Sequence, residues 1–135
     1  PSHHAAEIAR LNSAFNARDL DGWMADATDD FEMESRFSSV AGTIFRGRDG
    51  VDSWWRDLAD VWEWMDLQFE DSADVPADRT VTLWTLRGVG RGSGVRLNEP
   101  VGQRWHWRGA CISKIEYLDR LEAEGIVRGQ QPPER

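Results

Sequence analysis

Along this chain the spacing of hydrophobic residues changes from that of helices to that of strands. This order constrains the fold more than any other feature. Apolar residues recur every three to four positions in three early segments, which predicts helices at 5–17, 20–27 and about 49–65. Segments in which apolar and polar residues alternate predict strands at 30–35, 67–75, 80–89, 95–108 and 112–118. Helices that precede a long antiparallel meander indicate an α+β layered fold, with the sheet curling around the long third helix.

The length of 135 residues is typical of one ordinary domain. We expect a single domain over 1–128 that closes with a short helical turn at 119–124, ending at Gly125. The glycine- and proline-rich residues 129–135 are predicted to form a flexible tail.

Composition excludes several classes of partner. The formal net charge of −8 argues against nucleic acid or an anionic membrane as the main partner. No apolar run approaches the roughly 20 residues of a membrane helix, so we expect a cytoplasmic protein.

The single cysteine, Cys111, permits no intrachain disulfide and no cysteine metal cluster, and is expected to be a small strand residue. Scarcity of lysine among the basic residues suggests a bacterial source with a GC-rich genome.

Aromatic residues give the third helix a wide apolar stripe. Trp54, Trp55 and Trp62 share this stripe with smaller apolar residues. Rings at this spacing are typical of a helix that covers a sheet, because they contribute large buried areas. We therefore interpret the stripe as core.

Several motifs, in their order, carry a family resemblance. They are Phe15–Asp21, Asp29–Phe31, Phe45–Val51, Gly90–Val95 and Glu116–Arg120. With these motifs the chain resembles the nuclear transport factor 2-like superfamily and its SnoaL-like bacterial branch. The resemblance implies a cone-shaped, curved antiparallel or mixed sheet wrapped around three N-terminal helices. The superfamily includes ketosteroid isomerases, scytalone dehydratase, epoxide hydrolases and polyketide cyclases, so fold alone does not select a reaction.

Ketosteroid isomerase chemistry is not expected. By the resemblance, the catalytic base falls on Ser35, the tyrosine donor on Leu11 and the protonated acid on or near Gln103. Serine cannot remove a proton from carbon unaided, and leucine donates no hydrogen bond. The sequence therefore predicts no isomerisation of 5-ene-3-ketosteroids.

Alternation on strand 95–108 predicts which side chains line the cone. Glu99, Gln103 and Trp105 fall on the mostly apolar face, where polar groups in an apolar wall are typical of a small-molecule pocket. Arg104 and His106 fall on the opposite face, which we expect to face solvent or the second subunit of a homodimer.

Two acids are candidates for catalysis. Glu99 is the better one, because desolvation in an apolar wall would let a carboxylate act as a general acid or base near neutral pH. Alternatively, Glu99, beside Pro100, lies at the solvated mouth or pairs with an arginine. Glu116 lies near the position where the resemblance places an acid of the epoxide hydrolases. Residues expected to contact a ligand are Ser35, Phe37, Trp55, Gln103, Trp105 and Tyr117.

Three functional hypotheses remain open. The first is an acid/base enzyme without metal or organic cofactor, acting on a small apolar compound that bears a carbonyl or hydroxyl group. The second is a protein that binds such a ligand without catalysis. The third is a cone filled by its own tryptophans and used mainly for assembly. The presence of an acid inside the cavity separates the first two, and cavity volume separates both from the third.

Overall fold

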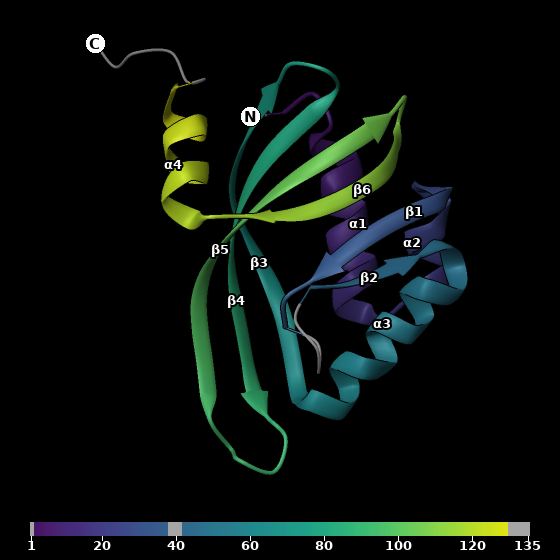
Figure 1. Cartoon of the computed structure of the whole chain (residues 1–135), viewed down its shortest axis with the longest axis vertical. Helices are drawn as coiled ribbons and strands as arrows, with labels where there is room; N and C mark the ends of the chain where they lie inside the picture. The colour runs from purple at the N-terminus through teal and green to yellow at the C-terminus, as the bar shows by residue number, and fades with distance from the viewer. Residues whose placement is uncertain (1, 38–41, 130–135) are drawn as a thin grey trace.

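The computed structural model describes residues 2–37 and 42–129, which form an α+β fold (Figure 1). The elements are α1 (Ala5–Ala17), α2 (Leu20–Ala25), β1 (Ala27–Ser35), β2 (Thr43–Arg46), α3 (Gly47–Val61), β3 (Trp62–Val75), β4 (Arg79–Gly90), β5 (Arg96–Arg108), β6 (Cys111–Leu118) and α4 (Arg120–Gly129). The predicted fold class is confirmed, and β2 adds a short strand directly before the third helix.

One mixed sheet organises the molecule. Its strand order is β2-β1-β6-β5-β4-β3, and every pair is antiparallel except β1 with β6. In Figure 1 the long strands β3, β4 and β5 bend, with α1, α2 and α3 gathered on one side of the sheet and α4 on the other. The sheet thus encloses a space against the first three helices.

Aromatic side chains fill most of that space. The stripe of α3 is buried at Val51, Trp54, Trp55 and Leu58, as its periodicity predicts. These residues pack with α1, α2 and the inner faces of the strands in the main core cluster. The interpretation of the stripe as core is therefore confirmed for Trp54 and Trp55, whereas Trp62 is partly buried against this core.

The third helix is shorter than predicted. It ends at Val61, and Trp62–Met65 belong to β3 instead. The cause lies far along the chain, because Trp62 pairs with Gly90, and the Arg91 N–H donates to the Val61 carbonyl over 2.9 Å. The Arg91 guanidinium also donates to the Ala59 carbonyl over 2.9 Å, which satisfies another carbonyl at the helix end.

The last helix is longer than predicted. α4 runs through Gly125 to Gly129, and the Asp119 side chain accepts a hydrogen bond from the Glu122 N–H over 3.1 Å at its start. Ala123 and Val127 pack in a second cluster with Val81 and Leu83 on the outer face of the sheet. This packing stabilises a helix where local sequence indicated a single turn. Of the expected tail, residues 130–135 lie outside the described residues.

No helix within 2–37 and 42–129 has both the length and the apolar character needed to cross a bilayer.

Candidate functional site

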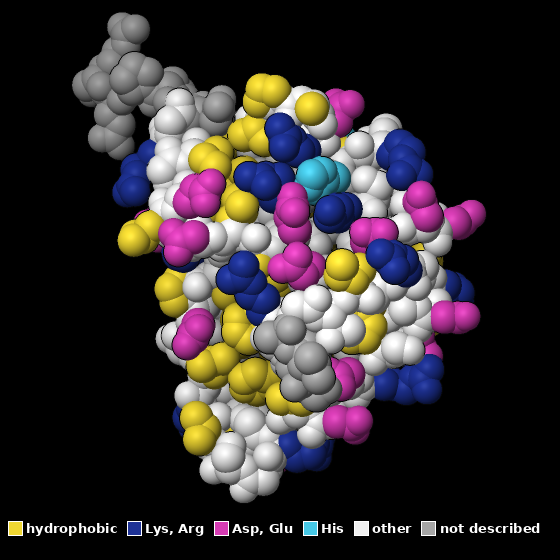
Figure 2. Space-filling model, viewed as in Figure 1, with side chains coloured by type: hydrophobic (Ala, Val, Ile, Leu, Met, Phe, Trp, Pro, Cys, Tyr) yellow, Lys and Arg dark blue, Asp and Glu magenta, His cyan; other side chains and the backbone are white. Residues whose placement is uncertain are grey.

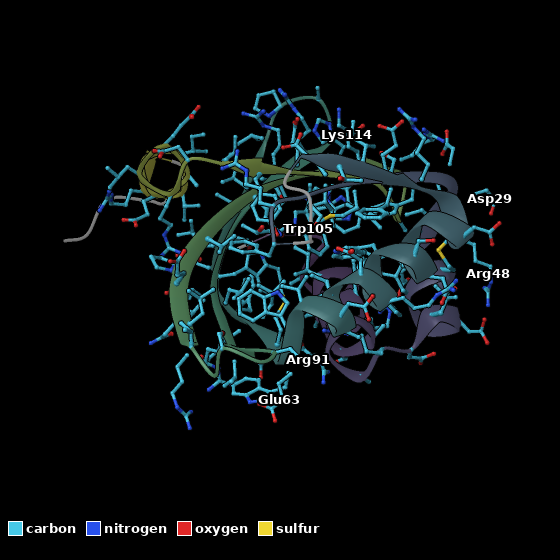
Figure 3. All side chains as sticks on the ribbon, turned by 60° about the horizontal axis from the view of Figure 1, so that its bottom comes forward. Asp29, Arg48, Glu63, Arg91, Trp105 and Lys114 are labelled. Carbon is cyan, nitrogen blue, oxygen red and sulfur yellow. The ribbon has the colours of Figure 1, made fainter. Side chains whose placement is uncertain are left out.

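The inner wall of the cone is formed by alternate residues of β5. Val101, Gln103, Trp105 and Trp107 are buried, as the alternation predicts. Figure 3 shows Trp105 within the curl of the sheet and Lys114 on its outer side.

Glu99 departs from its expected environment. It pairs with the buried Leu86 and therefore lies on the inner face, but its side chain is exposed at the mouth of the cone. The expectation of a carboxylate buried in an apolar wall is wrong, and the alternative of a solvated mouth position holds.

The space left inside the cone is very small. The cavity has a volume of about 20 Å³, and a single water needs roughly 10–15 Å³ on the same scale. Its lining consists of uncharged residues: Asn12, Phe15, Trp23, Met33, Trp54, Leu67, Trp84, Gln103, Trp105 and Ile115. The side chains of the protein itself therefore occupy most of the cone.

Gln103 is the polar centre of this wall. Its side chain is 1% exposed, and its Oε1 accepts a hydrogen bond from Trp105 Nε1 over 2.9 Å. Tyr117 lies directly opposite on β6 and hydrogen-bonds with Gln103 through side chains. Burial raises the pKa of the Tyr117 hydroxyl, only partly opposed by this hydrogen bond, so the phenol stays neutral.

A second space is bordered by Tyr117. This outer hollow has a volume of about 170 Å³ and is lined by Arg36, Phe37, Glu99, Tyr117 and Arg120, among others. The Phe37 and Tyr117 rings meet edge to face at 5.6 Å, and Trp62 Nε1 donates to the Phe37 carbonyl over 3.0 Å. The Gln103–Tyr117 pair therefore connects the inner cavity with the outer hollow.

The two spaces divide the residues predicted to contact a ligand. Gln103 and Trp105 line the inner cavity, and Phe37 and Tyr117 line the outer hollow together with Glu99. Ser35 is 1% exposed, and Trp55 packs within the core beside Trp23. Neither Ser35 nor Trp55 is part of the lining of these two spaces.

Sequence reasoning missed most of the cavity lining, including two tryptophans. Trp23 and Trp54 both line the cavity, from α2 and α3. The stripe of the third helix predicted the burial of Trp54, but periodicity cannot tell which core rings border an internal space.

Glu116 lies on the outer face of the sheet, away from the cavity. It pairs with Arg104 in register and accepts hydrogen bonds from Arg104 Nη1 over 3.2 Å and from His106 Nε2 at 2.7 Å. Partial burial opposes ionisation, but these hydrogen bonds outweigh it and hold the pKa of Glu116 below its ordinary value. Figure 2 shows basic, acidic and histidine side chains gathered over β5 and β6. Glu116 therefore lines neither the inner cavity nor the outer hollow.

Buried acids and metal-binding clusters do not occur in the described part of the chain. The buried polar side chains are Ser2, His4, Ser35, Ser72, Thr80, Thr82 and Gln103. Within residues 2–37 and 42–129, no three His, Cys, Asp or Glu side chains gather as metal ligands would.

A family model described as the SnoaL-like domain matches residues 8–116. The chain belongs to the SnoaL-like domain family. This result confirms the resemblance drawn from the sequence motifs.

Solved structures share the fold of this SnoaL-like domain at low sequence identity. TerC co-crystallised with polyporic acid has a TM-score of 0.74 and 18% identity, covering 93% of this chain and 98% of its own. A putative SnoaL-like polyketide cyclase from Jannaschia sp. CCS1 has a TM-score of 0.69 and 19% identity, covering 96% and 93%. Rv0760c from Mycobacterium tuberculosis, in complex with estradiol-17beta-hemisuccinate, has a TM-score of 0.69 and 15% identity, covering 91% and 98%. No curated protein matches the SnoaL-like chain in sequence.

Proposed function

We propose that this SnoaL-like domain binds a small, largely apolar molecule inside its cone. The observation that carries the proposal is Gln103, an amide 1% exposed among aromatic rings and linked to Tyr117 at the boundary of the outer hollow. A few placed polar groups in an apolar wall are typical of small-molecule sites. The ligand would bear a carbonyl or hydroxyl group and contact Gln103.

Ligands held by proteins of the same fold support this class of molecule. TerC was crystallised with polyporic acid, and Rv0760c with estradiol-17beta-hemisuccinate. The inner cavity of about 20 Å³ is too small for a ring compound, so binding requires aromatic side chains to move. Tyr117 and Phe37, which line the outer hollow, are the groups whose displacement would enlarge the site.

A thermal-shift screen with steroid, terpenoid, polyphenol and polyketide-like compounds tests the proposal. A ligand at about 100 times its dissociation constant stabilises the fold by about 2.7 kcal/mol. Gln103→Leu should weaken binding of the hit, whereas Gln68→Leu, the same change at an exposed strand position, should not. Absence of stabilisation by every compound, or equal binding by both variants, would contradict the proposal.

Acid/base catalysis is a second candidate, and the position of Glu99 favours it. Glu99 lines the same hollow as Tyr117, so it can reach a ligand that extends outward from the cone. In this proposal Glu99 is the acid or base, with no metal or organic cofactor. Glu99→Gln should abolish turnover of a bound compound without loss of affinity. Glu116→Gln, on the outer face, is the matched control and should leave turnover unchanged.

A third candidate is that the cone is filled by its own side chains and the protein serves mainly in assembly. The small interior volume favours this candidate. The proposed homodimer would use the charged outer face of β5 and β6, since α4 covers the neighbouring part of the sheet. Arg104→Glu would place an acid directly opposite Glu116 on this face. The added negative charge should dissociate a dimer, so that the variant sediments at the monomer mass. Sedimentation at the monomer mass across micromolar concentrations of the wild type would remove this candidate.

A further inference from the structure

The eight tryptophans of this chain divide into three groups by whether the indole N–H donates a hydrogen bond, is exposed, or is buried without a partner. Four donate to an acceptor: Trp62 to the Phe37 carbonyl, Trp84 to Thr82, Trp105 to Gln103 and Trp107 to Thr80. Trp64 is exposed. The remaining three, Trp23, Trp54 and Trp55, have buried Nε1 atoms without a hydrogen-bond partner.

This division follows the architecture of the cone. All four paired indoles lie on strands, whereas the unpaired ones lie on α2 and α3. An indole N–H can donate but not accept, so another donor cannot satisfy it. Buried donors normally have a partner, and an unpaired one in a native structure calls for an explanation.

Two of the unpaired indoles border the inner cavity. Trp23 and Trp54 are 2% and 3% exposed, their rings meet edge to face at 5.9 Å, and both belong to the lining. Trp55 is equally buried and unpaired but is not part of that lining. On the opposite wall, the Gln103 side-chain oxygen is already bonded to Trp105. Residues with unused donors therefore border the cavity on its helical side.

We propose that the inner cavity receives an uncharged hydrogen-bond acceptor of the ligand, a carbonyl oxygen, on the indole N–H groups of Trp23 and Trp54. This inference rests on the proposed binding function and specifies its ligand class. A cavity of about 20 Å³ accommodates an oxygen atom but not a ring, so the acceptor end of the ligand enters it.

The uncharged lining defines the acceptor further. No Arg, Lys, Asp or Glu is among the residues that line the cavity. A carboxylate placed there would lose its hydration without gaining a cation, which disfavours it strongly. A hydroxyl group can accept from the indoles, but its own proton would then need an acceptor in the lining. The side-chain oxygens there belong to Asn12 and Gln103, and both already accept hydrogen bonds, from Asn16 and Trp105. The site therefore selects a ketone, quinone or lactone carbonyl over an acid or an alcohol.

The experiment uses three probes of one shape: cyclopentanone, methylenecyclopentane and cyclopentanol. Each is titrated into protein with ¹⁵N-labelled indoles while the tryptophan N–H signals are followed by NMR. Cyclopentanone should bind roughly tenfold more tightly than methylenecyclopentane, the effect of gaining a hydrogen bond for a buried donor. It should also shift the Trp23 and Trp54 N–H signals downfield. The Trp84 and Trp107 signals, whose donors are already bonded, should move little.

Adjacent residues provide the matched variants. Trp54→Phe should lower the preference for ketone over hydrocarbon several-fold, whereas Trp55→Phe should retain it, although both remove a buried, unpaired indole N–H. The wild-type titration remains decisive if Trp54→Phe fails to fold.

The outcomes separate this inference from the binding function. Equal affinity for cyclopentanone and methylenecyclopentane, without shifts at Trp23 and Trp54, would overturn the carbonyl assignment while leaving the cone as a binding site. No binding by any probe up to its solubility limit would overturn both. Loss of ketone preference in Trp55→Phe alone would also overturn the assignment.

Discussion

Trp105 Nε1 donates a hydrogen bond of 2.9 Å to Gln103 Oε1 on the inner face of the same strand. The two side chains point to one face because side chains on the same face of a strand recur at every second residue. Tyr117 adds its own hydrogen bond to Gln103 from the neighbouring strand. One amide thus satisfies polar groups of two aromatic side chains in a wall that is otherwise apolar.

Gln103→Leu should reduce stability, because it leaves the Trp105 indole and the Tyr117 hydroxyl without this partner. An unsatisfied buried polar group costs about 1–3 kcal/mol. Gln68→Leu, at an exposed position on β3, should change stability by no more than about 0.5 kcal/mol. Urea unfolding of the two variants measures the difference. Equal stability would show that Gln103 is not needed by its neighbours.

Gly102→Ala should destabilise the protein because α4 approaches β5 closely at this position. An added Cβ would lie 2.6 Å from the Ala123 Cβ and 3.3 Å from the Leu118 carbonyl oxygen. Overpacking of this kind costs about 1–3 kcal/mol. The double variant Gly102→Ala/Ala123→Gly should recover part of the loss in an unfolding experiment.

Gly125→Ala is the control for Gly102. It lies within α4, and an added Cβ there meets nothing within 4 Å. Alanine should stabilise the helix by up to about 1 kcal/mol relative to glycine. The same loss of stability in both variants would contradict a specific contact between Gly102 and Ala123.

Stability should fall in acid partly through Asp74. Partial burial raises the pKa of Asp74, but hydrogen bonds from Ser2, the His3 N–H and Thr80 outweigh it and lower the pKa from 3.8 to about 2. The unfolded chain therefore binds the proton first, and the stabilisation present above about pH 4 is lost as the pH falls toward 2. Asp74→Asn should be less stable than wild type at neutral pH, with a difference that shrinks in acid.

Unfolding measured at several pH values from neutral to acid checks this prediction. Asp60→Asn, at an exposed position on α3, should follow the wild-type profile. A constant difference between wild type and Asp74→Asn at every pH would contradict the assignment to Asp74.

Ketosteroid isomerisation should be absent. The three positions assigned to that chemistry hold Leu11, Ser35 and Gln103, and all are buried without an acid among them. No group there removes a proton from carbon at neutral pH. The conjugated product absorbs in the ultraviolet, so its formation from a 5-ene-3-ketosteroid is easily followed. Turnover by the pure protein that exceeds the buffer rate would refute this account of the site.

Sequence periodicity predicted the faces of the elements better than their limits. Alternation placed Gln103 and Trp105 inside the cone and Arg104 outside, and it also placed Glu99 on the inner face. It could not show that the wall reaches solvent at Glu99, because that depends on where β6 ends. The end of α3 likewise depends on Gly90 and Arg91, which local helical spacing does not include. The unpaired indoles of Trp23 and Trp54 are a property of three-dimensional packing, so no pattern in the sequence reveals them.

The most direct measurement locates a bound ligand. Intermolecular nuclear Overhauser effects are recorded between a compound identified in the thermal-shift screen and assigned methyl groups of the protein. Binding inside the cone predicts contacts to the Met33 and Ile115 methyls, which line the inner cavity. Contacts confined to exposed side chains such as Val95 and Leu121, with none to Met33 or Ile115, would contradict ligand binding in the cone.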